Sequence, residues 1–271
     1  VLNYLMNSFE EKSMSGKEIR MGKLFSRGKA VIVAVDHGGF MGSIKGIEDL
    51  PKNINLYKKA DAILLNLNMA RHCGRFFASY DSPLCVVRVN WGSHYYENFK
   101  EGYGKRMTTV RQAVAFGADM VIVSLRIGGK EEASADNISL LGEIFEESES
   151  LGIPLIAEFI FVEAVGRFKG DRRIVEVGVR MCAEIGCDLI KTMYIEGFSD
   201  LVKSVPVPVL ALGGAKMKTD LDALRHAKRT VQEGASGVIY GRNVFQAENP
   251  EKFLDALIKV VKEGREPEEM I

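Results

Sequence analysis

One pattern recurs along the chain, in which a helical segment ends at a small residue and an apolar run follows directly. It occurs at 115–125, 184–194 and 233–241, each with a glycine at the junction, and at 57–67 without the glycine. Glycine suits a helix C-terminus because it adopts the left-handed conformation that closes the last turn. The apolar runs are largely continuous, which is typical of strands buried on both faces of a parallel sheet. The pattern therefore predicts repeated helix–strand units.

Further apolar runs complete a predicted set of eight strands, at 30–39, 83–92, 153–162 and 207–214. Residues that can cap a helix stand before four amphipathic segments, at Thr108–Thr109, Asp136–Asn137, Asp171 and Thr219–Asp220. Strands that alternate with helices form either a closed (β/α)8 barrel or an open, doubly wound sheet.

The length favours the barrel, because 271 residues are close to the ~250 that such barrels need. No Gly-x-Gly-x-x-Gly follows the first strand, which weakens the dinucleotide-binding alternative. We expect an α/β fold with one domain, a (β/α)8 TIM barrel over residues 26–271. A short N-terminal helical extension is expected over residues 1–25.

Composition excludes several classes of partner. Lys plus Arg and Asp plus Glu number 36 each, so no excess of charge indicates a nucleic-acid or membrane partner. No apolar run approaches the ~20 residues of a membrane span, and the N-terminus lacks a signal-peptide core. We therefore expect a cytoplasmic protein. The cysteines form no C-x-x-C pair and are expected to be reduced thiols, at positions Cys73, Cys85, Cys182 and Cys187. No spacing of ligands suggests a metal, and we expect no cofactor.

Candidate chemistry lies at the carboxyl ends of the strands, where (β/α)8 barrels hold their active sites. Lys191 stands within the apolar strand text "LIKTM", where an ammonium loses hydration at a cost of several kcal/mol unless it is paired or deprotonated. As the free amine it would attack a carbonyl and form a Schiff base, with Asp36 moving protons. The alternative is a structural ion pair of Lys191 with Asp36 or Glu158, and the residues alone leave both open.

Glycines at the ends of the seventh and eighth strands predict a phosphate site. Gly213, Gly214 and Gly241 expose backbone N–H groups there, and Arg242 adds a charge-assisted contact. Arg126, at the end of the fourth strand, is a further candidate for substrate binding. The same rule places Arg88, Asn90, Trp91 and Ser124 at strand ends without assigning them a role.

Several motifs, in this order, resemble the archaeal-type class I aldolase family: "VAVDHGGFMGSIKGIE", "MTTVRQAVAFGAD", "IKTMYIEGF", "VPVPVLALGGAK" and "GASGVIYGRNVFQ". That family includes fructose-bisphosphate aldolase, aminodideoxyheptulosonate synthase and the thiolase of autoinducer degradation. The resemblance implies that Lys191 is the Schiff-base lysine, that Asp36 is an acid/base residue, and that the strand-end glycines and Arg242 hold a substrate phosphate. It also implies a small phosphorylated substrate and a homo-oligomer, commonly a decamer.

The fifth strand departs from the family pattern. Aldolases of this type carry Tyr-Pro-Arg-Gly near its end, whereas this chain reads "AEFIFVEAVG" and places Ile160 against the tyrosine that donates a proton. Glu158 lies two residues earlier on the same strand face and is a candidate to replace it. Leu67 stands where the second strand of the family sometimes carries a basic residue. Both changes argue against ordinary fructose-bisphosphate cleavage.

Three hypotheses follow from these residues. The first is an aldolase-type lyase or transferase that forms a Schiff base with a phosphorylated keto compound. The second is a phosphate-binding isomerase or epimerase that uses Glu158 and Asp36 without an imine. The third is a non-catalytic phosphometabolite-binding protein.

Overall fold

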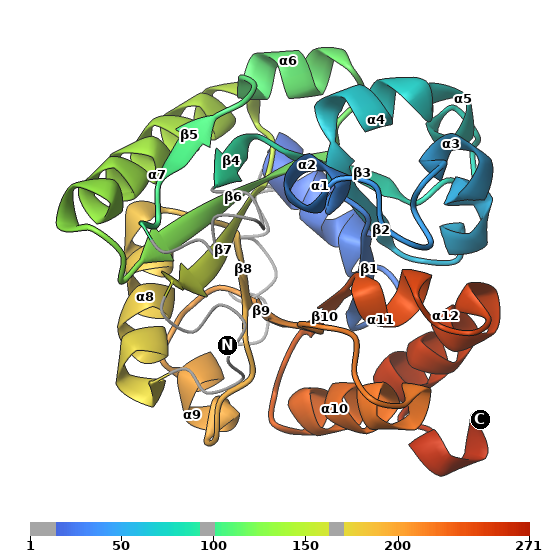
Figure 1. The fold of residues 1–271 in the computed structure, drawn as a ribbon. Coiled ribbons are helices and arrows are strands. Elements are labelled where there is room, and N and C mark those ends of the chain that lie inside the picture. Colours follow the sequence, from blue (N-terminus) through green and yellow to red (C-terminus); the bar gives the residue numbers. More distant parts are fainter. Residues whose placement is uncertain (1–14, 93–100, 163–170) are drawn as a thin grey trace, which may run out of the picture.

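The computed structural model describes residues 15–92, 101–162 and 171–271. In these residues, eight parallel strands close into a barrel with helices around it (Figure 1). The prediction of a (β/α)8 barrel is confirmed. In order around the barrel, the strands are β1 (Ala30–Ala34), β10 (Gly237–Tyr240), β9 (Val209–Leu212), β8 (Leu189–Thr192), β7 (Leu155–Phe161), β6 (Met120–Ile127), β3 (Leu84–Arg88) and β2 (Ala62–Asn66).

The helices follow the strands as the sequence pattern predicts. Thr109, Asp171 and Thr219 each cap a helix by accepting a backbone N–H with the side chain. The helices are α1 (Gly16–Leu24), α2 (Gly38–Met41), α3 (Leu50–Asn53), α4 (Leu67–His72), α5 (Gly74–Phe77), α6 (Val110–Ala115), α7 (Glu131–Leu151), α8 (Arg172–Ile185), α9 (Phe198–Lys203), α10 (Asp220–Gln232), α11 (Arg242–Phe245) and α12 (Pro250–Ile258). Short 3-10 turns cover Ile54–Tyr57 and Pro267–Glu269, and a π-helical turn covers Lys259–Glu263.

One helix start was predicted wrongly. Helix α7 begins at Glu131, before the Asp136–Asn137 pair that the sequence suggested as its start. Asn137 lies inside the helix and is fully buried. Its side-chain amide donates to the backbone oxygens of Gly102 and Arg126 at 2.7 and 3.0 Å. The residue therefore joins the helix to the barrel instead of capping the helix.

The stretch 83–92 is also not one strand. Its barrel strand β3 ends at Arg88, and Asn90–Gly92 forms a separate strand, β4, that pairs antiparallel with β5 (Gly104–Arg106). The Asn90 side chain accepts from Ser124 N and donates to Ser124 O, both at 2.9 Å. This side chain satisfies the edge of β6 that β3 no longer covers, so the chain turns away without leaving buried backbone groups unpaired.

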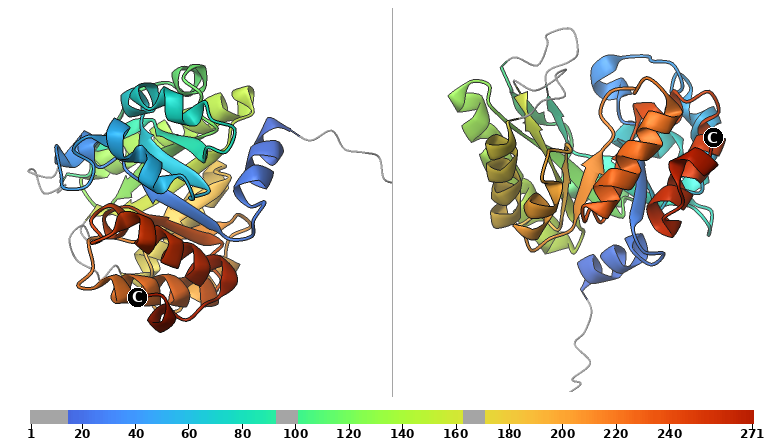
Figure 2. Two further views of the ribbon diagram at one scale, coloured as in Figure 1. Left: turned by 90° about the vertical axis from the view of Figure 1, so that its right-hand side faces the viewer. Right: turned by 90° about the horizontal axis from the view of Figure 1, so that it is seen from below.

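Two apolar clusters build the core. One lies between the strands and the surrounding helices, and the other fills the barrel interior. Leu24 of α1 belongs to the interior cluster, with Met21 and Phe25 packed against it. Helix α1 therefore covers the N-terminal end of the barrel, and Figure 2 shows it across one end of the molecule. The opposite end, where the strands finish, is left for the site.

Two further findings concern the rest of the chain. All four cysteines are buried and free. In the described part of the chain, none of the helices combines the length and the apolar character that a membrane span needs.

Candidate active site

The barrel interior changes from apolar to polar between two successive layers of side chains. On six strands, the residue two positions beyond the last interior apolar residue is polar, and side chains two apart share a strand face. We call these residues the polar layer: Asp36, Asn66, Arg88, Ser124, Glu158 and Lys191. On β9 and β10 the equivalent positions are Leu212 and Gly241. Within this layer, polar side chains thus come from six consecutive strands, and the two positions at β9 and β10 carry no polar side chain.

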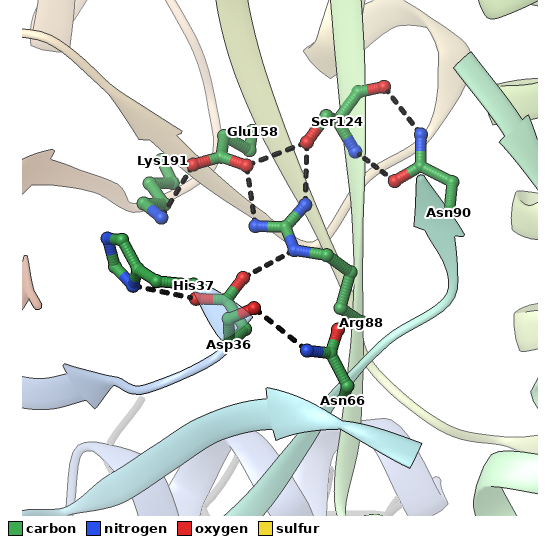
Figure 3. A network of polar contacts seen from close by, with 8 residues as sticks. All are labelled: Asp36, His37, Asn66, Arg88, Asn90, Ser124, Glu158 and Lys191. Atoms are coloured by element: carbon green, nitrogen blue, oxygen red, sulfur yellow. Dashed lines mark hydrogen bonds and ion pairs between the residues drawn. The ribbon is translucent and has the colours of Figure 1, made fainter. Parts of the chain in front are cut away.

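Arg88 joins three members of the polar layer (Figure 3). Its Nε donates to Asp36 Oδ2 at 2.5 Å and its Nη1 to Ser124 Oγ at 2.6 Å. Its Nη2 donates to Glu158 Oε2 at 2.7 Å, and Ser124 Oγ donates to the same carboxylate oxygen at 2.7 Å. Arg88 itself is only 7% exposed. One guanidinium therefore binds both carboxylates of the layer and the hydroxyl beside them.

Lys191 contacts the remaining oxygen of Glu158. The two residues face each other in the β7–β8 register, and Lys191 Nζ lies 2.6 Å from Glu158 Oε1. Both are almost fully buried. Of the two ion pairs that the sequence left open, the structure shows the one with Glu158, while Asp36 contacts Arg88.

The charges of the layer keep both carboxyl groups ionised. Burial raises the pKa of Glu158, but Arg88 and Lys191 outweigh it and hold this pKa well below its usual range. Burial likewise opposes ionisation of Asp36, and Arg88 and other nearby cationic groups lower its pKa overall. The two carboxylates in turn raise the pKa of Arg88 against the effect of burial. In the resting site, both carboxylates are therefore proton acceptors.

His37 and Asn66 contact Asp36 from its other side. Asn66 Nδ2 donates to the backbone oxygen of Asp36 at 2.8 Å, and His37 Nδ1 lies 3.5 Å from Asp36 Oδ1. The His37 ring packs against Phe40 and Phe245, and burial lowers its pKa to about 4. The imidazole is thus neutral at physiological pH and adds no positive charge beside Asp36.

A cavity of about 710 Å³ opens beside the polar layer. The structure brings all eight residues predicted for the site to this one cavity: Asp36, Arg126, Glu158, Lys191, Gly213, Gly214, Gly241 and Arg242. Ile160, which the sequence aligns with the family tyrosine, also lines the cavity. The fifth strand thus presents the Glu158 carboxylate and the aliphatic Ile160 side chain to the cavity, on one face.

The loops after β9 and β10 are held together by Asn243. Its Nδ2 donates to Gly213 O and Ala215 O at 2.9 and 3.1 Å, and its Oδ1 accepts from Met217 N at 2.8 Å. Gly214 adopts a positive φ of 66°, which side chains rarely tolerate. Asn243 therefore links the loop after β9 to the start of α11, and Arg242 lines the same cavity as the glycines.

Arg126 lies on the other side of the mouth. In the order of strands around the barrel, β6 is four strands from β10, and β8 lies midway between them. Arg126 is 7% exposed, and burial lowers its pKa to about 10, with Arg88 adding to the effect and Glu158 opposing it. The guanidinium remains charged at neutral pH, so cationic groups stand on opposite sides of Lys191.

Sequence reasoning missed three contributors to the site. Arg88 and Ser124 were placed at strand ends without a role, although the period of two along each strand puts them in the layer of Asp36 and Glu158. His226 on α10 lines the cavity with its Nδ1 2.5 Å from the hydroxyl of buried Tyr240. No periodicity distinguishes His226 from the other residues of its polar helix face.

A model of the DeoC/LacD aldolases matches residues 30–247, which covers the barrel strands and the whole polar layer. The chain belongs to the DeoC/LacD aldolase family. The family resemblance stated from the motifs is thereby confirmed, and with it an aldolase-type enzyme.

Curated relatives match this aldolase over most of its length. An aldolase of Saccharolobus solfataricus is 34% identical over 93% of this chain and 96% of its own. A 2-amino-3,7-dideoxy-D-threo-hept-6-ulosonate synthase of Archaeoglobus fulgidus is 29% identical over 95% of each chain. A 3-hydroxy-5-phosphonooxypentane-2,4-dione thiolase of Escherichia coli strain K12 is 30% identical over 91% of this chain and 82% of its own.

Solved structures agree with the aldolase fold. An archaeal fructose 1,6-bisphosphate aldolase superimposes with a TM-score of 0.78 at 27% identity, covering 91% of this chain and 99% of that one. A second archaeal fructose-1,6-bisphosphate aldolase has its catalytic lysine covalently bound to the carbinolamine intermediate of the substrate. It superimposes with a TM-score of 0.77 at 27% identity, covering 90% and 98% of the two chains.

Proposed function

We propose that this aldolase makes or breaks a carbon–carbon bond in a small phosphorylated keto compound through a Schiff base on Lys191. The observation that carries the proposal is the buried Lys191 ammonium, 2.6 Å from the Glu158 carboxylate at the wall of the cavity. The carbinolamine-bearing lysine of the archaeal structural neighbour supports the same chemistry.

Glu158 is the proposed proton carrier for imine formation. It takes one proton from Lys191 Nζ, and the amine attacks the carbonyl carbon while the carbonyl π electrons move to oxygen. A proton passes from nitrogen to that oxygen and gives the carbinolamine. Glu158 then returns its proton to the carbinolamine hydroxyl, which leaves as water as the nitrogen lone pair forms the C=N bond. The carboxylate is restored, and Lys191 carries the positive charge as an iminium.

Asp36 is the proposed base for bond cleavage. It accepts the proton of the substrate hydroxyl two carbons from the imine, the carbon–carbon bond breaks, and its electrons move to the iminium to form an enamine. Asp36 is suited to this role because Arg88 keeps it ionised. Ile160 has no titratable group, so proton transfer falls to Asp36 and Glu158.

The substrate phosphate is proposed to bind at the loops after β9 and β10. Gly213, Gly214 and Gly241 leave the backbone uncovered beside Arg242, and these residues share the cavity with Lys191. Anchoring the phosphate there fixes the carbonyl near Nζ, and such orientation contributes several kcal/mol to the lowering of a barrier. Arg126 is proposed to contact the far end of the substrate. The implied homo-oligomer, a decamer, stays a prediction that sedimentation velocity checks.

Borohydride trapping tests the imine. The protein is incubated with a panel of keto phosphates, reduced with sodium borohydride, digested and analysed by mass spectrometry. We expect a stable adduct on Lys191 with at least one member of the panel. Lys191→Met should lose it, whereas Lys58→Met, a change at an exposed lysine, should retain it.

Two results would count against the proposal. One is the absence of any adduct across the panel. The other is substantial turnover by Lys191→Arg, which keeps a cation beside Glu158 but forms no imine, and which would favour the isomerase or epimerase hypothesis.

A further inference from the structure

We infer that Arg88 is a positioning residue: its guanidinium ties Asp36 and Glu158 together and keeps a carboxylate beside Lys191 in position to take its proton. This inference rests on the proposed function and names a residue that the resemblance does not assign. The geometry that points to it is the contact of one guanidinium with Asp36 just after β1, Ser124 of β6 and Glu158 of β7, at 2.5, 2.6 and 2.7 Å.

The shape of the contact requires arginine. Its planar fork offers N–H groups in several fixed directions, whereas a lysine ammonium is a point charge on a flexible stem. Glu158 lies on β7 and Asp36 directly follows β1, and these two strands are neighbours neither of each other nor of β3. A lysine at position 88 would keep the charge but would not hold three partners in this arrangement. Arg88→Lys, which keeps the positive charge, and Arg88→Met, which removes it, therefore separate the effect of the charge from that of the arginine geometry.

The charges show why the proton transfer needs Arg88. Asp36 and Glu158 carry two negative charges, and Arg88 and Lys191 carry two positive ones, so these four groups sum to zero. When the Lys191 proton moves to Glu158, the sum stays zero, and it stays zero again in the iminium. Without Arg88 the same buried set would carry one excess negative charge, and a buried carboxylate without its partner takes up a proton. A protonated Glu158 could not accept the proton of Lys191.

Other charged or titratable groups surround this set, and they do not replace Arg88. Arg126 on β6 and Arg242 on α11 add positive charge at the mouth, and His37 at the start of α2 is neutral. The direct contacts to the second oxygen of Glu158 come from Arg88 and Ser124. Loss of Arg88 therefore takes the guanidinium contact from both carboxylates, and Glu158 keeps its contact with Lys191.

The first test needs no substrate. Protein labelled with ¹³C at its Asp and Glu carboxyl groups is titrated by NMR between about pH 3 and 8, and the two signals are assigned with Asp36→Asn and Glu158→Gln. In the native protein we expect both carboxyl groups to stay ionised across the pH range in which exposed Asp and Glu side chains take up protons. In Arg88→Met at least one of them should titrate between about pH 5 and 8. Arg75→Met, at an exposed arginine, should leave both unchanged.

The second test measures the yield and rate of the borohydride adduct against pH. Arg88→Met should lower the rate at neutral pH by about 10²-fold and move the acid limb of the profile toward neutrality. Arg88→Lys should lower the rate less and keep the acid limb near its native position. If Arg88→Met does not fold, Ser124→Ala replaces it. That variant removes one donor to Glu158 and one acceptor of Arg88, and should shift the same limb by a smaller amount in the same direction.

The outcomes separate this inference from the proposed function. Carboxyl signals that titrate alike in the native protein and in the Arg88 or Ser124 variants would overturn the role of Arg88, even if the Lys191 adduct forms. An unchanged pH profile with only a raised KM would overturn it too. If the carboxyl titration shifts as expected but no keto phosphate gives an adduct, Arg88 positions the carboxylates and the imine proposal fails.

Discussion

Glu158→Gln is the substitution that most directly tests the chemistry of the site. It keeps the size of the side chain but removes the charge that lies between Arg88 and Lys191. Three donors converge on the native carboxylate, two on Oε2 and one on Oε1. An amide has one acceptor oxygen, and its NH₂ group would face either the guanidinium or the ammonium. The variant therefore loses a base and gains an unfavourable contact between donors.

The expected magnitudes follow from these contacts. Breaking a buried ion pair by removing one partner costs about 3–5 kcal/mol, because the other charge stays buried. For a chain of this length, such a loss lowers the melting temperature on the order of 10 °C. Loss of a general acid–base group lowers the rate by about 10²–10⁴-fold. We expect Glu158→Gln to fold less stably and to form the Lys191 imine at least about 10²-fold more slowly.

Rapid-quench borohydride trapping measures the imine rate, and thermal unfolding followed by circular dichroism measures stability. Glu146→Gln, the same change at an exposed position of α7, is the matched control and should alter neither. A Glu158→Gln protein that is folded at the assay temperature and forms the imine at the native rate would refute the assignment of Glu158 as proton carrier. A drop in stability with no drop in rate would leave only a structural role for it.

Two further predictions concern the phosphate contact and the acid stability. Arg242→Ala should raise KM for a keto phosphate by about 10–100-fold with a smaller effect on kcat, because a hydrogen bond to a charged group contributes about 1.5–3 kcal/mol. Steady-state kinetics measure both constants, with Arg173→Ala as a control at an exposed arginine. An unchanged KM in Arg242→Ala contradicts the prediction. His37 has its pKa lowered to about 4 by burial, so the unfolded chain binds more protons between about pH 4 and 6.5, and stability should fall by roughly 3 kcal/mol as pH decreases through that window. Urea unfolding of the native protein and His37→Gln at several pH values checks the sign, and equal pH dependence in both would show that His37 does not contribute.

Much of the fold could be predicted because it depends on local signals. The eight apolar runs became the eight barrel strands, and Thr109, Asp171 and Thr219 cap helices where expected. The prediction failed at 83–92, where periodicity does not show that the chain leaves the barrel after Arg88. It failed again at the start of α7, because Asn137 caps nothing and binds backbone oxygens far from it in sequence.

The sequence by itself determined which polar side chains stand near the strand ends, among them Lys191, Glu158 and Asp36, and the period of two tells which residues of one strand share a face. It also determined the glycines that leave the backbone bare after β9 and β10. Only the tertiary structure decided which of these groups touch. Arg88 meets Asp36 across β2 and Glu158 across β6 because the closed barrel turns every polar residue of the layer toward one axis. Contacts between strands that are not neighbours depend on this closure, which no local pattern encodes.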